Sequence, residues 1–286
     1  KGTFGTALIA AGSINYTGAA LLAGKAAYRI GAGLVTLAVP SAIHTTLAGQ
    51  FPEATWVLLP QKMGVVAADA ASVLLENLDR ATALLIGPGF GMEETTREFI
   101  ENLLREKSTQ KKNAGRIGFI HAEGEKKEEA NSALPPMVFD ADGLKLLAQI
   151  DDWYKMIPDV AVLTPHPGEM AVMTELSVEE IQSDRLEIVR KYAQKWGHVV
   201  VLKGAFTVVA APSGETYTIP VVTPALARAG SGDVLAGLIV GLRAQGLGAV
   251  EAAVAGSWVH AQAGLYAAEM LGTTASVLAG DILAAV

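Results

Sequence analysis

Short apolar segments recur along the chain, and each ends in glycine, proline or a polar cluster. They are rich in Val, Leu and Ile and read TALIAAG, GLVTLAVP, ATALLIGPG, PMVFDADG, DVAVLTPHPG and HVVVLKG. Because polar and apolar positions do not alternate within them, they are typical of strands buried on both faces of a mostly parallel sheet. The intervening sequence predicts helices over 17–30, 65–78, 95–105, 177–196 and 233–244. Strands and helices in alternation predict a three-layer α/β/α fold.

The pattern changes after HVVVLKG. The segments TVVAA and TYTIP flank PSGE, in which Ser213 and Gly214 can supply a turn, so they predict a late antiparallel hairpin. Residues 105–136 are mostly polar and charged around a short apolar segment, RIGFIHA, and predict a surface insertion. We expect a single folded domain over residues 1–286 that carries this insertion.

Composition excludes several classes of function. The 286 residues are 51% hydrophobic, enough for one large core, and the formal net charge is −7, so no basic field attracts nucleic acid or an anionic membrane. Zero cysteines exclude disulfides and Cys-based metal sites. The longest charge-free stretch, 4–24, is interrupted by polar residues, and Lys1 opens directly onto a glycine-rich segment. We therefore expect no membrane span, no signal peptide and a cytoplasmic protein.

Glycine-rich loops follow the predicted strands. They read AAGSINYTG, GPGFG, DADG, TPHPGE, KGAFT and AGSGD. Each alone is explained by a tight turn, but ligands in doubly wound sheets bind outside the carboxyl ends of the strands, where these loops would meet. The loop GPGFG, residues 87–91, has no reactive side chain, so its expected role is a close backbone approach to a ligand.

The stretch AGSGD combines an anion cradle with a carboxylate. Gly230, Ser231 and Gly232 can turn backbone N–H groups toward one point, and the helix that starts near Asp233 offers its positive end. Asp233 could cap that helix. Beside a cradle that holds a transferring phosphoryl group, it could instead take a proton from a hydroxyl. We favour the general base.

The other candidates carry weaker signals. Lys203 in KGAFT could pair with a phosphate or lie at the surface. His166 lies between two prolines in a rigid projecting loop, which is more typical of a site than of a core. Glu169 could cap the following helix or bind Mg²⁺ through water. Asp140 and Asp142 have the same two interpretations.

These motifs, in this order, resemble those of the ADP- or ATP-dependent NAD(P)H-hydrate dehydratases. The resemblance covers nearly the whole chain outside 105–136 and is carried by KGTFG, TGAA, RIGAGLVTLAVP, GPGFG, DADGL, TPHPGEM, VVLKGAFTVV and AGSGDVLAGLIVGLRAQG. It implies a ribokinase-like fold and repair of the S epimer of NADHX and NADPHX. The hydrate hydroxyl would be phosphorylated by ADP or ATP and the phosphate then eliminated. Because both ligands are polyanions and the protein is acidic, we also expect Mg²⁺.

The resemblance also implies roles for individual residues. Contacts to the hydrated dinucleotide would come from Ala32, Gly89, His166 and Asp233, the last as the base. The adenine nucleotide would be lined by Lys203, Gly204, Ala205, Phe206, Thr207 and Gly232. The family is often tetrameric, so we expect a homo-oligomer. Since the chain begins at the first family motif without Met, it could belong to a longer protein with an NAD(P)H-hydrate epimerase part.

Two other functions are compatible with parts of this sequence. A small-molecule kinase acting on hydroxymethylpyrimidine or hydroxyethylthiazole would use the same AGSGD base. TPHPGE and GAGLVT favour the dehydratase, because a small vitamin precursor would not need these loops to hold a second nucleotide. A nucleotide-sensing module without turnover would be expected to lack Asp233, which is present.

Overall fold

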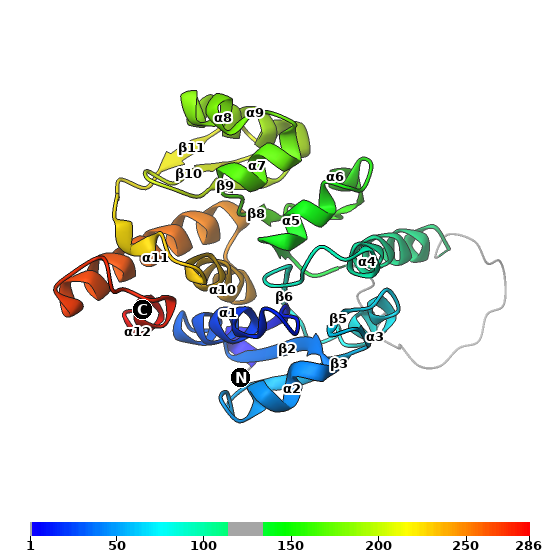
Figure 1. The fold of residues 1–286 in the computed structure, drawn as a ribbon. Helices are drawn as coiled ribbons and strands as arrows, with labels where there is room; N and C mark the ends of the chain where they lie inside the picture. The colour runs from blue at the N-terminus through cyan, green and yellow to red at the C-terminus, as the bar shows by residue number, and fades with distance from the viewer. Residues whose placement is uncertain (1, 114–133) are drawn as a thin grey trace.

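One nine-stranded sheet organises the chain, with helices on both faces (Figure 1). The structure is a computed structural model that describes residues 2–113 and 134–286. The sheet order is β11-β10-β9-β8-β7-β6-β1-β2-β3. Its strands are β1 (Thr6–Ala10), β2 (Leu34–Pro40), β3 (Thr55–Leu59), β6 (Ala83–Ile86), β7 (Met137–Phe139), β8 (Val162–Leu163), β9 (Val199–Leu202), β10 (Val208–Ala210) and β11 (Thr216–Thr218). Strands β1–β3 and β6–β9 pair in parallel, and β10 and β11 are antiparallel.

Alternate residues of β1 divide the core into two layers. Leu8 and Ala10 face a cluster with one set of helices, whereas Ala7 and Ile9 face the other set. The first set is α3 (Ala70–Glu76), α4 (Glu94–Asn113), α5 (Asp142–Leu147), α6 (Trp153–Met156), α7 (Pro167–Thr174), α8 (Val178–Ser183) and α9 (Arg185–Trp196). The second set is α1 (Thr17–Arg29), α2 (Ser41–Ala48), α10 (Ser231–Ala244) and α11 (Ala249–Leu271), with α12 (Ala279–Ala284) packed on α1, α10 and α11.

Helices α1 and α10 lie unusually close together, and this fixes where α10 begins. A Cβ atom added to Gly237 would lie 2.3 Å from the Ala23 carbonyl oxygen, and one added to Gly241 would lie 2.9 Å from that of Ala27. Only glycine allows this backbone approach. The amino end of α10 is therefore held near the amino end of α1, beside the carboxyl ends of the strands (Figure 1).

The three-layer fold, the six predicted strands and the late hairpin are confirmed. The helix predicted over 65–78 is wrong at its start, because Val65–Val66 pairs as β5 with β4 (Gln61–Lys62) and α3 begins only at Ala70. The helix predicted over 177–196 is interrupted at Asp184, whose side chain accepts the Glu187 N–H and starts α9.

Strand β3 was not predicted. It lies at the sheet edge, where Thr55 and Leu58 are exposed, so it lacks the mostly buried pattern of the six predicted strands. Helix α4 runs to Asn113, beyond the predicted end at 105 and into the predicted insertion. The RIGFIHA segment, 116–122, lies outside the described residues.

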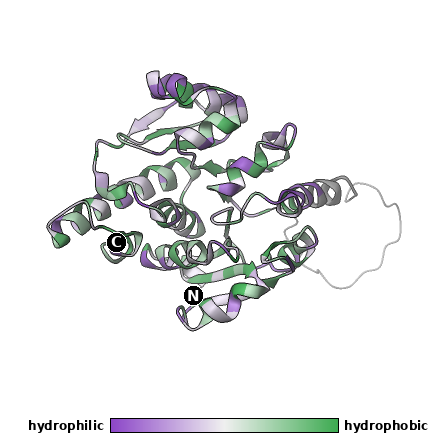
Figure 2. Cartoon of the chain, viewed as in Figure 1, coloured by the Kyte–Doolittle hydropathy of each residue, from purple (hydrophilic) through white to green (hydrophobic). Residues whose placement is uncertain are grey.

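Hydrophilic residues concentrate on the outer helices, such as α4 and α8, and hydrophobic residues on the sheet (Figure 2). Within residues 2–113 and 134–286, no helix is long and apolar enough to cross a bilayer.

Candidate active site

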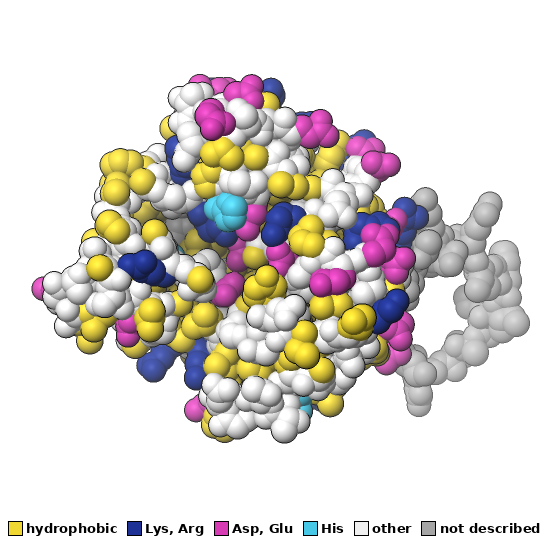
Figure 3. Space-filling model, viewed as in Figure 1, with side chains coloured by type: hydrophobic (Ala, Val, Ile, Leu, Met, Phe, Trp, Pro, Cys, Tyr) yellow, Lys and Arg dark blue, Asp and Glu magenta, His cyan; other side chains and the backbone are white. Residues whose placement is uncertain are grey.

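A cavity of about 630 Å³ opens at the carboxyl ends of β7, β8 and β9 and over the first turn of α10. Figure 3 shows acidic, basic and histidine side chains gathered around a hollow in this face of the molecule. Most of the predicted site residues meet in the cavity: Asp140, His166, Glu169, Lys203, Gly204, Ala205, Thr207, Gly230, Ser231, Gly232 and Asp233.

The first turn of α10 forms an open cradle of backbone N–H groups. Gly230, not Asp233, is the N-cap, and its φ of 85° is a left-handed conformation that favours glycine. The Ser231 N–H is occupied by the Arg228 carbonyl. Within the described chain, the N–H groups of Gly232 and Asp233 have no acceptor. Two free donors and the positive end of the helix macrodipole thus face the cavity, as an anion site requires.

Asp233 is the third residue of α10 and not its cap. No side-chain capping hydrogen bond forms at this helix start, so the capping interpretation is not supported. Burial raises the pKa of the Asp233 carboxyl to about 7, and the nearby Asp140 carboxylate adds to this, while Lys203 opposes it. At neutral pH a carboxylate with this pKa is partly ionised and can accept a proton. Its raised pKa also makes it a stronger base than an ordinary carboxylate.

A buried ion pair lies beside the cradle. The Lys203 Nζ atom lies 2.7 Å from Asp140 Oδ1 and 3.5 Å from Glu169 Oε2. Thr164 donates its hydroxyl to the same Asp140 oxygen at 2.7 Å. The Asp140 side chain is almost fully buried, and its Oδ2 atom has no hydrogen-bond partner. A Cβ at Gly232 would lie 3.4 Å from Lys203 Nζ, so the absence of a side chain there keeps the lysine open to the cradle.

His166 and Glu169 start α7 through a capping box. The His166 Nδ1 atom accepts the N–H groups of Gly168 and Glu169, and Glu169 Oε2 accepts the His166 N–H at 2.8 Å. The capping role predicted for Glu169 is thus observed, and its metal role stays a prediction. Burial lowers the pKa of His166, and the neighbouring Glu169 carboxylate partly opposes this. The neutral ring carries its proton on Nε2, which lies 3.3 Å from Glu169 Oε1.

The GPGFG and DADG loops are fitted to each other. Asp142 accepts the Gly91 N–H at 2.9 Å, which gives this carboxylate a structural role. A Cβ at Gly87 would lie 2.3 Å from the Asp140 carbonyl oxygen and 2.5 Å from the Gly143 Cα. The loop was predicted to bring its backbone close to a ligand. At Gly87 the close approach is instead made to Asp140 and Gly143 of the same chain. Ala141, with φ of 53°, completes the strained turn that carries Asp140 into the cavity.

The KGAFT loop lines the cavity and contains a glycine with positive φ. Gly204 has φ of 136°. Phe206 is exposed, also has positive φ at 53°, and does not line the cavity in this chain. Sequence reasoning missed Arg185, whose guanidinium donates to the carbonyls of Leu202 and Lys203 and so holds the loop in place. An arginine within an exposed amphipathic helix gives no signal of such a role.

Two predicted dinucleotide contacts lie outside the cavity. Gly89 is at the same edge of the sheet as the cavity. It packs so closely on the start of α1 that a Cβ would lie 2.9 Å from the Tyr16 carbonyl oxygen. Ala32 precedes β2 at the opposite edge, buried, with its N–H donated to the Ala27 carbonyl. The structure does not bring Ala32 together with the other site residues.

The comparison with protein families agrees with this geometry. The family model described as NAD(P)H-hydrate dehydratase matches residues 7–110 and 122–285. The chain belongs to the NAD(P)H-hydrate dehydratase family. The predicted resemblance is thereby confirmed, and the family match favours the dehydratase over the small-molecule kinase.

Individual relatives of this dehydratase-family chain agree. It is 40% identical to the bifunctional NAD(P)H-hydrate repair enzyme Nnr of Moorella thermoacetica over 99% of this chain and 48% of that protein. It is 35% identical to the ADP-dependent (S)-NAD(P)H-hydrate dehydratase of Neisseria meningitidis over 99% and 83%. The crystal structure of a Bacillus subtilis ADP/ATP-dependent NAD(P)H-hydrate dehydratase, co-crystallized with ATP/Mg²⁺ and soaked with CoA, is 27% identical with a TM-score of 0.72 over all of this chain and 90% of that one. The chain thus spans about half the length of the bifunctional relatives.

Further residues of this family member line the cavity. His260, from α11, reaches the cavity floor beside Ser231. A lone histidine in an alanine-rich helix carries no motif that would have identified it. An apolar wall between β11 and α10 is formed by Val221, Val222, Thr223, Pro224, Leu226 and Ala227. Arg228 adds a cation at this wall, where one guanidinium nitrogen donates to the Ala275 carbonyl.

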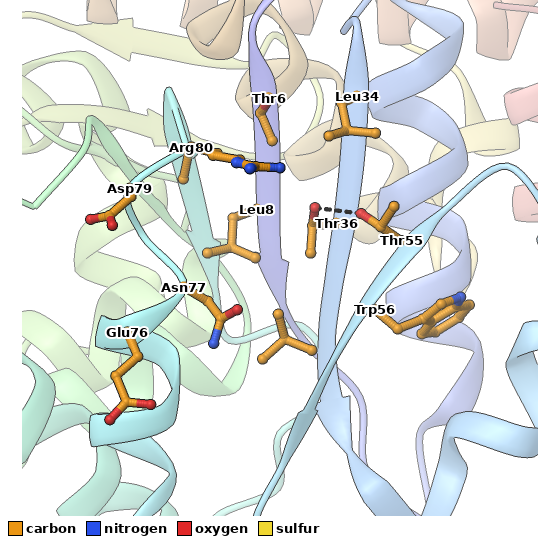
Figure 4. A pocket seen from close by; sticks show the side chains of 12 residues that line it. Thr6, Leu8, Leu34, Thr36, Thr55, Trp56, Glu76, Asn77, Asp79 and Arg80 are labelled. Atoms are coloured by element: carbon orange, nitrogen blue, oxygen red, sulfur yellow. Dashed lines mark hydrogen bonds between the residues drawn. The ribbon is translucent and has the colours of Figure 1, made fainter.

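A second hollow, of about 370 Å³, lies at the opposite edge of the sheet, by the amino ends of β1, β2 and β3 (Figure 4). Arg80 reaches across it, whereas Asp79 and Glu76 point away. The hydroxyls of Thr36 and Thr55 bond to each other at 2.7 Å. Its polar groups do not converge on one point, so the cavity at the carboxyl edge is the candidate active site.

Proposed function

We propose that this chain catalyses the ADP- or ATP-dependent dehydration of the S epimer of NADHX and NADPHX. The observation that carries the proposal is the place of Asp233, a carboxylate with a pKa near 7 in the same turn as the free N–H groups of the cradle. A phosphoryl group in the cradle and a hydroxyl beside Asp233 would be held as phosphoryl transfer requires.

Asp233 takes the proton of the hydrate hydroxyl while the oxygen of that hydroxyl forms a bond to the terminal phosphorus of the nucleotide. The bond from that phosphorus to the bridging oxygen breaks, and the shortened nucleotide leaves with the electron pair. The N–H groups of Gly232 and Asp233 and the Lys203 ammonium stabilise the negative charge that develops on the phosphoryl oxygens. The carbon–oxygen bond of the phosphorylated hydrate then breaks. Inorganic phosphate leaves with the electron pair, and loss of a proton from the neighbouring carbon restores the double bond of NADH or NADPH.

The two ligands divide the cavity between them. We assign the adenine nucleotide to Gly232 and to the loop from Lys203 to Thr207, whose cavity-facing members lie against the apolar wall. His166, on the other rim with a neutral ring that can donate from Nε2, would bind the hydrated dinucleotide together with Asp233. The dinucleotide roles of Gly89 and Ala32 rest on the family resemblance alone.

The donor set fits a Mg²⁺ ion that is bound mainly through phosphate. Among the described residues, no three histidine or carboxylate side chains are grouped to hold a metal by themselves. Mg²⁺ usually takes one or two carboxylates together with substrate phosphates and water. The unpartnered Oδ2 of Asp140 is available at the cradle for direct or water-mediated contact. Glu169, whose two carboxylate oxygens already contact His166, would add a contact through water. The ion would supply charge neutralisation on the phosphates.

The wider setting follows from the relatives and the surface. We infer one domain with the 105–136 insertion, acting in the cytoplasm next to or fused with an NAD(P)H-hydrate epimerase, because several relatives are bifunctional repair enzymes. Exposed apolar side chains on α11, Trp258, Tyr266 and Met270, support subunit contacts of a homo-oligomer such as a tetramer.

Absorbance at the reduced-nicotinamide band tests the proposal. Purified protein and Mg²⁺ are mixed with hydrated NADH, with ADP in one cuvette and ATP in another. Growth of the band in either cuvette is expected, and growth in only one names the phosphoryl donor. No growth in either, with nucleotide still bound, would reject the dehydratase, and vitamin-precursor alcohols would then be tested as kinase substrates.

A further inference from the structure

A buried histidine contacts the cradle from a separate helix. The His260 side chain comes from α11, is only 7% exposed, and has its Nε2 atom 3.2 Å from the Ser231 hydroxyl oxygen. Burial lowers the pKa of His260 to about 4, although a hydrogen bond with the Ser231 backbone opposes the shift. The imidazole is therefore neutral at physiological pH and has one N–H donor and one acceptor nitrogen.

Ser231 is the one residue of the cradle with a hydroxyl, and the direction of its proton decides what it can bind. Its backbone N–H is already taken by the Arg228 carbonyl. If His260 Nε2 accepted the hydroxyl proton, Ser231 would present only lone pairs to the cavity and would repel an anion. If Nε2–H donates to the hydroxyl oxygen, the Ser231 proton is free to point into the cradle.

A phosphate bound in the cradle favours the second arrangement. The Ser231 N–H is already used, so the hydroxyl is the group with which Ser231 can donate to an anion. The hydroxyl can donate to the anion only if His260 Nε2, 3.2 Å away, donates to it instead of accepting its proton.

We propose that His260 is a positioning residue whose Nε2–H donates to the Ser231 hydroxyl and turns the hydroxyl proton toward a phosphate bound in the cradle. Ser231 then supplies a third donor beside the N–H groups of Gly232 and Asp233. The inference deepens the proposed function, because it assumes that the cradle binds phosphate.

Variants of His260 and Ser231 test the arrangement through the affinity for ADP, measured by calorimetry, and through kcat and KM. We expect His260→Leu and Ser231→Ala each to weaken ADP binding or turnover by about 10-fold, the usual scale for one lost hydrogen bond to a charged group. The double variant should be no worse than Ser231→Ala alone, because His260 acts through the hydroxyl. His260→Gln, which keeps a side-chain N–H, should recover part of the loss.

His198 provides the matched control. It is equally buried, bonds the backbone of Ala161 and Tyr154, and lies at the start of β9, away from the carboxyl edge. His198→Leu should lower the free energy of unfolding without changing the affinity for ADP. In the unsubstituted protein, ¹⁵N NMR of the histidine rings should show the proton of His260 on Nε2.

Additive losses in the double variant, or a His260 ring protonated on Nδ1, would overturn the inference while leaving the proposed function intact. An unsubstituted protein that binds neither ADP nor ATP would reject the proposed function and this inference together. A His260→Leu variant that loses stability as His198→Leu does but binds and turns over ADP normally would reduce His260 to a core residue.

Discussion

The Lys203 ammonium lies 2.7 Å from one oxygen of Asp140, while the other oxygen of the same carboxylate is buried without a partner. That free oxygen faces Gly232 in the cradle, 3.8 Å from where a Cβ would be. The charge of Asp140 helps to raise the pKa of Asp233, and Lys203 limits the rise. The ion pair thus sets the strength of the base as well as one wall of the phosphate site.

Removing the lysine should leave a buried charge uncompensated. Lys203→Met is expected to lower the free energy of unfolding by about 3 kcal/mol, measured by urea unfolding at pH 8. Adding Asp140→Asn to this variant should recover much of the loss. The exposed pair of Lys155 and Asp152, 2.8 Å apart, is the control, and Lys155→Met should leave stability unchanged within error. Equal losses in the two lysine variants would contradict the account.

Replacing the base should separate chemistry from binding. Asp233→Asn is expected to reduce kcat by about 10²- to 10⁴-fold while the Kd for ADP changes by less than about 3-fold. Calorimetry and steady-state kinetics provide the two numbers. A parallel loss of affinity and turnover would mean that Asp233 only maintains the helix start.

Asp233→Asn, which is expected to reduce kcat, should increase the stability of the folded protein at high pH. Since the folded pKa of Asp233 is about 7, above its ordinary value of 3.8, its contribution to stability is complete below pH 4 and is lost as pH rises through 7. Asp233→Asn removes this loss, so it should raise the free energy of unfolding at pH 8 by roughly 2 kcal/mol and change it little at pH 4. Destabilisation at pH 8 would argue against a buried, raised-pKa carboxylate.

The pH dependence of kcat/KM should follow the free base. Only ionised Asp233 accepts a proton, so activity should rise with pH to a plateau with a midpoint near 7. Asp140→Asn removes a neighbouring negative charge and should move the midpoint to lower pH. A midpoint that is unchanged in this variant would show that another group controls the profile.

Gly87 should tolerate no side chain. Its φ of 118° and the 2.3 Å approach to the Asp140 carbonyl predict that Gly87→Ala lowers the free energy of unfolding by about 3 kcal/mol. Gly18, in the first turn of α1 with open space around its Cβ position, is the control, and Gly18→Ala should be neutral or slightly stabilising. Thermal unfolding of both variants decides the matter.

Chelation should stop turnover. Because no three histidine or carboxylate side chains of the described residues are grouped to hold a metal, the proposed Mg²⁺ would be bound mainly through phosphate. We expect excess EDTA to abolish activity and added Mg²⁺ to restore it, with the folded structure unchanged by circular dichroism. Full turnover in excess EDTA would reject the role of the ion.

Most of the fold was predictable because its signals are local. The strands buried on both faces read as continuous apolar runs, and α1, α10 and the hairpin begin and end at glycines, prolines or polar residues. The edge strand β3 escaped detection because two of its five side chains are exposed, and α3 starts late because Val65 and Val66 pair with β4. These outcomes depend on tertiary neighbours, which short windows do not contain.

The same contrast between local signals and tertiary neighbours explains which site residues were predicted. Asp233, Lys203 and His166 were identified because each follows a strand or a glycine turn that leads to one edge of the sheet. His260 and Arg185 were missed, because helix packing alone brings them to the cradle and the KGAFT loop. Ala32 lies at the far edge because it precedes the amino end of β2, although its motif is as recognisable as the others.

The ratio of reduced nicotinamide formed to nucleotide consumed tests the central claim most directly. Hydrated NADH, Mg²⁺ and ADP or ATP are incubated with the unsubstituted protein and with Asp233→Asn, and both products are quantified at matched nucleotide occupancy. The account predicts one NADH for each nucleotide shortened, and almost none of either product in the variant. NADH formed without nucleotide consumption, or an Asp233→Asn variant as fast as the unsubstituted protein, would contradict it.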